Sequence, residues 1–576
     1  MPITPGKWVA ESSDYRPDRY YRYAELTDLL HRWAAEHPNL VSIESIGQSL
    51  EGRDIWLLTI TDRATGSPES KPAYFVDANI HADEVTGVAT VLWLVNHLLT
   101  SLHDPAIQRL LTHTTFYLVP AINVDGMDLS LSEVPNGFIR SSLRPFPHVE
   151  QQDGLVEKDI DGDGTILSMR IKDPAGPWKA STLDPRVMTR RGPDDFDGDF
   201  YFVLPEGEIQ NWDGVRVPIA PTLHGLDANR NFPADWAPHW VQDGAGAYPL
   251  SEPETRALAD FLIAHPNIHG SQHFHTWSAV ILRPPTAHPT SDMPATDRNN
   301  YIAIGKLGEE ETGYPCIGIY DDFAYDRKQA MKGGLLDWVY EQLGLIAFST
   351  ELWSLPKKAG IEVTDFIGFF KDRPEGHDAA MLAVLDREVE GEGFRDWTPF
   401  EHPQLGPVEI GGWESTFTTT NPPGSMLEEV TAPNARFVLR AAQTAPLLEI
   451  RDVNVESLGS DIHKVSLAVH NSGFLPTFVT DMGRRSGVAK PVKVTIDLGE
   501  GGELISGEPE VEIGHLDGRS SIHGQLLWRD VSPMLNRAKA EWIVRQPAGS
   551  TVAGSTVTVT AATPKAGTAT LDIRLG

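Results

Sequence analysis

The spacing of apolar residues predicts alternating helices and strands in the first part of the chain. Leucines and a tryptophan recur at every third or fourth position in residues 24–36, which is the pattern of one helix face. Further helices are predicted over residues 84–100 and 252–264. Three apolar runs typical of strands lie between the first two helices, at 41–47, 55–60 and 73–80. A fourth run, at 115–124, follows the second helix. This alternation predicts an α/β sheet with helices on both faces.

Residues 127–220 interrupt this alternation. They are rich in Asp, Gly, Pro and Arg, and their apolar residues show little periodicity. We interpret the segment as a long insertion of loops at one end of the sheet. Functional residues are often found on such loops, because the sheet beneath them holds the loops in place.

The pattern changes after about residue 400. A connector that contains one helix, over 426–443, is predicted for residues 401–446. From residue 447 onward apolar residues alternate with a period of two, and turn signals such as NSG, GEGG and TPKAG separate the runs. That pattern is typical of a β-sandwich. The sequence therefore predicts an α/β domain in 1–400, the connector in 401–446 and a β-sandwich-like accessory domain in 447–576.

Composition narrows the range of partners. The 576 residues carry 48 Lys and Arg against 80 Asp and Glu, a formal net charge of −32. An acidic surface repels phosphate, which argues against nucleic acid and against an anionic membrane as partners. The single cysteine, Cys316, excludes an intrachain disulfide and a zinc site built from cysteines. The first residues lack the apolar core of a signal peptide, so we expect a cytoplasmic protein. The oligomeric state is not predicted.

His81 and Glu84, in the sequence HADE, follow an apolar strand and open a predicted helix. Residues three apart at a helix start can point to one side, where this pair would offer a nitrogen and oxygens to a metal ion. Three downstream features supply further residues of suitable types: GLDANRNFP at 225–233, His275 before an apolar strand, and Glu351 at the end of another. A metal hydrolase needs ligands, a base and an anion binder, and these residues could supply all three.

With these motifs in this order, the chain resembles the zinc metallocarboxypeptidases, the family of the carboxypeptidase A-like peptidases, and in particular its bacterial branch. The resemblance runs from about Tyr23 to about Leu355. It includes SIGQSLEGRDIWLLTI, where the family has G-x-S-x-E-G-R, and PAINVDG at 120–126, which is similar to the family's P-x-N-P-D-G. The resemblance implies a mixed-sheet α/β peptidase domain, one zinc ion, and peptide or protein C-termini as substrates.

The zinc ligands and the general base of the family match single positions of this chain. His81 and Glu84 match the first two ligands, which implies the His₂Glu site that carboxypeptidase A itself exemplifies. His275 matches the third ligand because TWSAVIL follows it, whereas His273, two residues earlier, is the rival. Glu351 matches the general base.

Two further matches concern the substrate. Asn229 and Arg230 lie in DANRN, the segment that holds the substrate's terminal carboxylate in this family. A guanidinium suits that role because it can pair with a carboxylate through two parallel hydrogen bonds. Arg140, in FIRSSLR, resembles the arginine that polarises the scissile carbonyl. Arg144 and Arg170 are alternatives for it, because the insertion disturbs the spacing.

The chain departs from the family pattern at several positions. Asp83 stands before the zinc-binding glutamate, where the family often has Arg or Asn. The family's mobile active-site tyrosine falls by spacing on Gln329, and Tyr320 or Tyr325 could replace it. The specificity position is Leu336, which carries no charge and indicates an apolar or undemanding substrate pocket, unless it is a core leucine.

Acidic residues in the insertion suggest a second cation. Asp159, Asp161 and Asp163 have the spacing of an EF-hand start. An EF-hand loop requires Glu at its twelfth position, and that position is Arg170, so the loop is not an EF-hand. The three carboxylates could still hold calcium in another geometry, or they could form a solvated acidic turn.

The sequence thus predicts a zinc carboxypeptidase. In this hypothesis zinc lowers the pKa of a bound water to roughly 7, Glu351 takes its proton, and Arg140 and zinc stabilise the oxyanion. Two alternatives stay open: an amidase on the same scaffold that acts on cell-wall peptides or N-acyl amino acids, and a non-catalytic binding protein that reuses the fold. Residues 447–576 are expected to take no part in catalysis, because they contain no cluster of ligands or of nucleophile and base.

Overall fold

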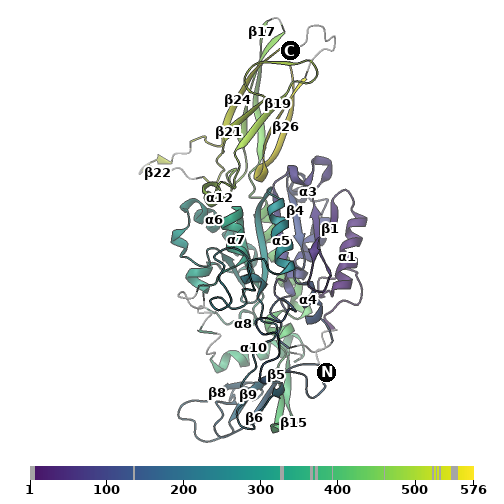
Figure 1. The fold of residues 1–576 in the computed structure, drawn as a ribbon, viewed down its shortest axis with the longest axis vertical. Helices are drawn as coiled ribbons and strands as arrows, with labels where there is room; N and C mark the ends of the chain where they lie inside the picture. Colours follow the sequence, from purple (N-terminus) through teal and green to yellow (C-terminus); the bar gives the residue numbers. More distant parts are fainter. Residues whose placement is uncertain are drawn as a thin grey trace.

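The computed structural model shows three regions arranged along one long axis (Figure 1). A small β region lies at one end, an α/β region in the middle, and a β-rich C-terminal region at the other end. The residues that the structure describes are 7–133, 137–324, 330–363, 368–369, 374–391, 393–459, 461–521, 525–526, 529–530, 533–545 and 556–575.

An eight-stranded mixed sheet forms the centre of the α/β region. Its strands in spatial order are β1 (Val41–Gln48), β2 (Asp54–Ile60), β4 (Thr115–Val119), β3 (Ala73–Ala78), β11 (Ile268–Thr276), β14 (Ile346–Leu352), β12 (Val280–Arg283) and β13 (Cys316–Gly318). The neighbours β4, β3, β11 and β14 run parallel to one another. Such central strands are covered on both faces, and every residue of β3 is buried accordingly.

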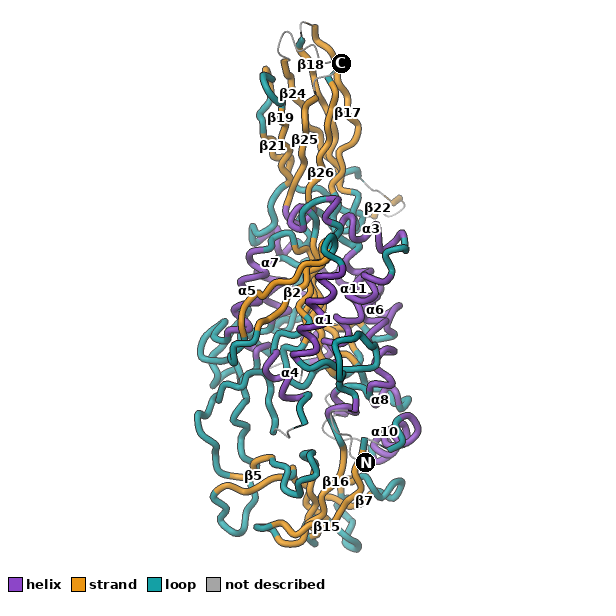
Figure 2. Tube along the Cα trace, turned by 90° about the vertical axis from the view of Figure 1, so that its right-hand side faces the viewer, coloured by secondary structure: helices purple, strands orange, loops and turns teal. Residues whose placement is uncertain are grey.

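Helices cover both faces of this sheet (Figure 2). One face packs against α1 (Tyr23–Glu36), α2 (Thr86–Thr100), α6 (Ala295–Thr312) and α11 (Leu427–Ala442), and the other packs against α5 (Pro253–Ala264) and α7 (Leu335–Leu343). Further helices are α3 (Pro105–His113), α4 (Val124–Ser130), α8 (Leu355–Lys358) and α10 (Glu375–Glu388). The predicted α/β fold is confirmed. Across the described stretches, none of the helices combines the length and apolarity that a bilayer crossing requires.

Part of the segment 127–220 forms strands, although its sequence predicted loops. Strands β5 (Gly154–Glu157) and β10 (Gly207–Gln210) pair antiparallel with each other. A six-stranded sheet, called the insertion sheet below, has the order β15 (Phe394–His402), β16 (Gly406–Trp413), β6 (Ser168–Lys172), β9 (Tyr201–Pro205), β7 (Trp178–Ala180) and β8 (Met188–Arg190). The strands contributed by the segment have three to five residues, too few for alternation to stand out between Asp- and Gly-rich turns.

Residues 401–446, predicted to be a connector, pack into both of these regions. Strand β16 supplies a central strand of the insertion sheet, between β15 and β6. Helix α11 lies where a helix was predicted and packs against α2 and α6 on one face of the large sheet. The exact division of the chain into domains stays a prediction.

The C-terminal region is a sandwich of two antiparallel four-stranded sheets, as predicted. One sheet has the order β17 (Leu448–Gly459), β18 (Ile462–Asn471), β24 (Arg537–Arg545) and β20 (Glu503–Ser506). The other has the order β21 (Glu510–Gly514), β19 (Val492–Asp497), β25 (Thr556–Thr563) and β26 (Gly567–Arg574). Alternating apolar residues of both sheets form its core, among them Val465, Val469, Val494 and Trp542.

Buried polar contacts join the sandwich to the α/β region. The carboxylate of Asp297 on α6 accepts hydrogen bonds from the backbone N–H groups of Asp481 (2.6 Å) and Met482 (3.0 Å) at the start of α12 (Asp481–Arg485). Lys565, between β25 and β26, is buried, and its Nζ donates to the carbonyl oxygen of Ile268 (2.8 Å), the first residue of β11. Burial lowers the pKa of Lys565 to about 7, because the ammonium group loses its hydration.

We expect Lys565→Met to alter the pH dependence of stability. The pKa of about 7 in the folded chain, against the usual 10.5, means that the unfolded chain binds more protons between those values. The stability of the wild type should therefore rise with pH across that window, by up to about 1.4 kcal/mol per pH unit relative to the variant. Thermal melts from pH 7 to 10 measure the difference in Tm, and any advantage of the variant should shrink as pH rises.

The matched control is Lys490→Met, since Lys490 also donates to a backbone carbonyl oxygen, that of Gly487 (3.0 Å), but does so at an exposed site. Its Tm should differ from that of the wild type by the same amount at every pH. A pH-independent difference for Lys565→Met would contradict the prediction.

Candidate active site

Three neighbouring parallel strands, β3, β11 and β14, end at the same edge of the central sheet, and candidate residues gather there. The loop after β3 carries His81, the end of β11 carries His275, and the end of β14 carries Glu351. In the register of β11 and β14, His275 lies opposite Glu351. Sites in open α/β sheets form at the carboxyl ends of the strands, and this group follows that rule.

The loop between β3 and α2 turns back so that His81 and Glu84 face the same side. Asn79 has a left-handed backbone conformation with φ of 60°, which asparagine tolerates better than most residues. Its Nδ2 donates to the carbonyl oxygens of His81 (2.8 Å) and Ala82 (3.1 Å). The side chain of Asn79 thus holds the turn that carries both candidate ligands.

The start of α2 is fixed from two sides. A Cβ atom at Gly87 would lie 2.9 Å from the Cβ of Phe274 on β11, so the helix can approach the sheet this closely only with glycine. Asn421 lies on the other side. Its Oδ1 accepts from the N–H (3.0 Å) and the hydroxyl (2.7 Å) of Thr86, and its Nδ2 donates to the carbonyl oxygen of Asp83 (2.7 Å).

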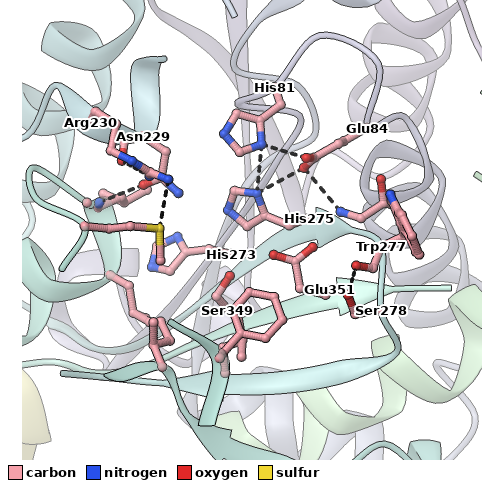
Figure 3. A pocket seen from close by; sticks show the side chains of 18 of the residues that line it. His81, Glu84, Asn229, Arg230, His273, His275, Trp277, Ser278, Ser349 and Glu351 are labelled. Atoms are coloured by element: carbon pink, nitrogen blue, oxygen red, sulfur yellow. Dashed lines mark hydrogen bonds and ion pairs between the residues drawn. The ribbon is translucent and has the colours of Figure 1, made fainter. Parts of the chain in front are cut away.

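His81, Glu84 and His275 form one buried group (Figure 3). Nδ1 of His81 lies 2.7 Å from Oε1 of Glu84, and Nδ1 of His275 lies 3.0 Å from Oε2 of Glu84. The two Nδ1 atoms are 3.2 Å apart, and one ligand atom from each residue lies within 4.8 Å of the others. Two imidazoles and a carboxylate are donors that zinc prefers, so the residues present fit this metal.

The electrostatics of the group also suit a cation. Burial raises the pKa of Glu84, but the charge on His81 and the hydrogen bond with His275 outweigh it, so the pKa falls and the carboxylate stays ionised. Burial lowers the pKa of His275, which favours the neutral imidazole. Metal ions bind ionised carboxylates and neutral imidazoles, so these two shifts favour binding. Burial and Arg140 lower the pKa of His81, but Glu84 and Asp227 outweigh them and raise it, so His81 must release a proton when it binds a metal ion.

Asp227 joins the metal-ligand group to two arginines, and sequence analysis gave it no role. Its Oδ1 lies 3.3 Å from Nε2 of His81. Its Oδ2 accepts from Nε of Arg140 (3.2 Å) and lies 3.9 Å from Nη2 of Arg230. Burial raises its pKa, but the nearby cations lower it well below its usual range. A carboxylate behind a ligating imidazole fixes the orientation of the ring. Its position at the start of DANRN was the signal that could have revealed it.

Glu351 projects from β14 toward the buried group (Figure 3). It is not one of the three residues whose ligand atoms converge. Burial raises the pKa of Glu351 to about 8, and the negative charge of Glu84 acts in the same direction. A carboxyl group with a pKa in this range can both accept and return a proton near neutral pH.

Asn229 and Arg230 lie on the opposite side of the two imidazoles from Glu84 (Figure 3). The guanidinium of Arg230 donates to the carbonyl oxygen of Asn229 (2.7 Å) and approaches the sulfur of Met331 (3.1 Å). Among the described residues it forms no bidentate pair with a carboxylate, and it borders the pocket. Arg230 is therefore placed to bind an anion that enters the site.

The structure separates the three arginines considered for carbonyl polarisation. Arg140 borders the pocket beside Glu84, with Nη1 3.5 Å from Oε1. Arg144 pairs instead with Glu252 (2.9 Å). Arg170 pairs with a carboxylate of the insertion sheet and stacks between two aromatic rings. Of the three, only Arg140 is among the residues that line the pocket.

His273, the rival for the third ligand, has other partners. It lies on the same strand and also borders the pocket. Its Nδ1 is 2.8 Å from Oδ2 of Asp77, and its Nε2 is 2.9 Å from Oγ of Ser271. Both ring nitrogens are thus occupied, while His275 joins the metal-ligand group.

A pocket of about 480 Å³ opens beside the buried group. Part of its lining is apolar and consists of Leu282, Ile319, Phe323, Met331, Leu335 and Leu336. Leu336 lines the pocket and also belongs to the core between the sheet and α7, and its part in substrate preference stays a prediction. Of the residues considered for the mobile tyrosine, Gln329 and Tyr325 lie outside the described residues, and Tyr320 is not among those that line the pocket.

In the acidic loop around Asp159, Asp161 and Asp163, carboxylates accept hydrogen bonds from backbone N–H groups of the same loop. Both carboxylate oxygens of Asp159 accept loop N–H groups, from Gly162 (2.7 Å) and Gly164 (3.0 Å). Asp159 and Asp161 come within 4.8 Å of the buried Glu206, whereas Asp163 is not part of that group. These hydrogen bonds account for the acidic spacing without calcium, so the structure gives the calcium hypothesis no support.

Known proteins resemble this chain over the same region. A model of the family described as zinc carboxypeptidase matches residues 26–159 and 185–368, more than half of the chain. Human carboxypeptidase A6 is 26% identical over 59% of this chain and 61% of its own length, and bovine carboxypeptidase A1 is 24% identical over 58% and 62%. The chain thus spans about three fifths of the length of these relatives.

A solved structure and a second family model also match parts of this chain. The crystal structure of thrombin activatable fibrinolysis inhibitor has a TM-score of 0.42 at 17% identity, covering 76% of this chain and 78% of that one. A model described as a domain of unknown function matches residues 447–574, the region of the β-sandwich.

We expect Asp227→Asn to weaken zinc binding without unfolding the chain. The substitution keeps the shape of the side chain but removes the negative charge beside Nε2 of His81. Loss of such an orienting carboxylate typically weakens metal affinity about 10–100-fold. Competition with a chromophoric chelator measures the affinity. The control Asp77→Asn alters a buried aspartate that contacts His273 instead, and it should leave zinc affinity unchanged. Equal losses from both variants would contradict the role assigned to Asp227.

Proposed function

The chain belongs to the zinc carboxypeptidase family, and we propose that it hydrolyses the C-terminal peptide bond of peptides or proteins. The observation that carries this proposal is the position of Arg230, on the pocket wall across from the buried His81, Glu84 and His275. A metal-binding group and a guanidinium that forms no bidentate pair with a described carboxylate, both at one pocket, can hold the scissile bond and a free terminal carboxylate.

The three converging residues would hold one zinc ion. Zinc in such a site supplies Lewis-acid chemistry, which polarises a carbonyl group and lowers the pKa of water. Asp227 would keep the imidazole of His81 oriented toward the ion through the contact with Nε2. Thr276 adds a backbone N–H that donates to Oε2 of Glu84 (3.2 Å) and fixes the carboxylate.

Glu351 and Arg140 would be the side chains that act directly on the reacting atoms. Glu351 would accept a proton from the attacking water and deliver it to the leaving amine. Arg140 would stabilise the negative charge that develops on the scissile carbonyl oxygen, an effect typically worth about 3–4 kcal/mol for one donor. The carboxylate of Asp227 (3.2 Å) holds Arg140 in place for this role.

The apolar wall of the pocket indicates the side chain that follows the scissile bond. Leu282, Ile319, Phe323 and Leu336 offer no charged partner to it, so the proposal includes a preference for apolar C-terminal residues. Placement within the bacterial branch of the family stays a prediction.

We expect Glu351→Gln to retain zinc and lose turnover. The amide cannot accept a proton, and general-base help is typically worth about 10²–10⁴-fold in rate, so kcat should fall by that factor. Steady-state kinetics and zinc analysis of the same preparation provide the two readings. As a control, Glu254→Gln alters another buried glutamate with a raised pKa, which accepts from the N–H of Leu50 away from the pocket. Zinc loss from Glu351→Gln would mean that Glu351 is a ligand.

Arg230→Ala should separate an exopeptidase from an amidase. Leaving a substrate carboxylate unpaired in a closed site costs on the order of 3–5 kcal/mol, so kcat/KM for free C-termini should fall by roughly 10²–10³-fold or more. Slow cleavage of C-terminally amidated peptides should be spared. The control Arg256→Ala removes an exposed arginine of α5. Equal losses on free and amidated peptides would favour the amidase.

A further inference from the structure

A second cavity, of about 610 Å³, lies next to the pocket of the candidate active site and shares two lining residues with it. Asp83 and Phe138 border both cavities. We propose that the second cavity, called the acyl chamber below, binds the part of a peptide substrate that precedes the scissile bond and favours basic side chains there. The proposal rests on the proposed function for the direction in which the substrate lies. The volume falls within the range of about 300–1,000 Å³ found for ligand pockets.

Two of the segments that line the acyl chamber lie outside the match to the family, whereas the others, including Glu157, lie inside it. Residues 164–168, which lead into β6, form one wall, and residues 413–416, at the end of β16, form another. The family match stops at 159, resumes at 185 and ends at 368, so neither segment belongs to it. The acyl chamber is therefore built jointly by the region that matches the family and by two segments that the match leaves out.

The position of Arg230 sets the direction of the substrate. Arg230 and Asn229 lie on one side of the two imidazoles and Glu84 on the other (Figure 3). The acyl chamber borders Asp83, the neighbour of Glu84 in the chain, and includes neither Asn229 nor Arg230. A peptide whose terminal carboxylate pairs with Arg230 must therefore extend its preceding residues toward the chamber.

The lining of the acyl chamber is acidic and rich in hydroxyl groups. Its carboxylates are those of Asp83, Glu157 and Glu414, and none of the described lining residues is a lysine or an arginine. Hydroxyl groups come from Ser130, Ser132, Thr165, Ser168, Ser415 and Thr416. Burial raises the pKa of Asp83 and of Glu414. The attraction for ammonium and guanidinium groups is therefore placed chiefly at Glu157.

Glu414 and Glu157 differ in how many of their carboxylate oxygens already accept hydrogen bonds from the backbone. Both oxygens of Glu414 accept backbone N–H groups, from Thr416 (3.2 Å) and Phe417 (3.1 Å). Glu157 is half-buried and accepts one N–H through Oε2, that of Phe138 (3.0 Å). The ring of Phe138 is 51% exposed where the two cavities meet, so a peptide passing between them would cover it. Glu157 is thus the best placed partner for a basic side chain.

Equilibrium binding to full-length, zinc-loaded Glu351→Gln tests the acyl chamber without turnover. The probes are N-terminally labelled pentapeptides that end in alanyl-phenylalanine and carry Lys, Gln or Glu at the third and fourth positions from the C-terminus. Fluorescence anisotropy should give a Kd about fivefold or more lower for Lys than for Gln, and a higher Kd for Glu. The preference should weaken in 0.5 M salt, because salt screens partly exposed charges. Equal Kd values for the three peptides at low salt would overturn the proposal.

A second substitution identifies the charge responsible. Glu157→Gln, introduced into the same background, keeps an oxygen acceptor for Phe138 but removes the charge, and it should bring the Kd ratio of the Gln to the Lys peptide close to one. The control Glu208→Gln alters a glutamate of the paired strand β10 that contacts Lys158 (2.9 Å) and does not line the chamber, so it should leave the ratio unchanged. A ratio that both variants lower equally would mean that the charge of the whole chain, and not the acyl chamber, causes the preference.

Hydrolysis of an N-acylated dipeptide by the wild-type enzyme is measured alongside, because this substrate does not reach the acyl chamber. If the wild type does not hydrolyse this dipeptide, the proposed function is refuted. The binding of the pentapeptides then tests the acyl chamber by itself. Dipeptide hydrolysis with no charge preference among the pentapeptides would retain the carboxypeptidase and reject the chamber.

Discussion

The parallel pairing of β11 with β3 and β14 is the constraint on which the site depends. It brings the carboxyl ends of three strands to one edge, and the register places His275 beside Glu351. A shift of one residue along β11 would turn His275 to the other face of the sheet, because side chains alternate along a strand. The helices on both faces, and the glycine that lets α2 approach β11, serve to hold this arrangement.

The buried carboxylates and the cations of the site stabilise one another. Glu84, Asp227 and Glu351 gather around two guanidinium groups, and burial raises the pKa of Glu351 to about 8. A buried carboxylate is costly unless it is paired, so the arginines and imidazoles also stabilise the ionised carboxylates around them. A divalent cation would add positive charge at the centre of this group and would favour the ionised form of every carboxylate around it.

The sequence predicted the layered fold from short-range apolar patterns, and it predicted the metal-ligand group because separated motifs of the chain resemble those of a known family. HADE lies at a strand–helix junction, and the pairs β1 with β2 and β3 with β4 come from apolar runs that are plain in the sequence. The insertion sheet left no such pattern, since β6 pairs with β16 far along the chain, through contacts such as Met169 opposite Ile410. Asp227 was missed although it opens the DANRN segment, because its contacts with His81 and Arg140 join residues far apart in the sequence.

Asn421 has a consequence for how this chain could have been assembled in evolution. It lies beyond the end of the family match, yet it caps α2 and holds the backbone of Asp83 inside the HADE loop. Helix α11, which follows it, supplies part of the core over the large sheet. An ancestral gene fusion that simply appended a β-sandwich would have left the peptidase fold self-sufficient. Here the joining segment is itself part of the α/β core, so a cut at the end of the family match would not separate two self-sufficient regions.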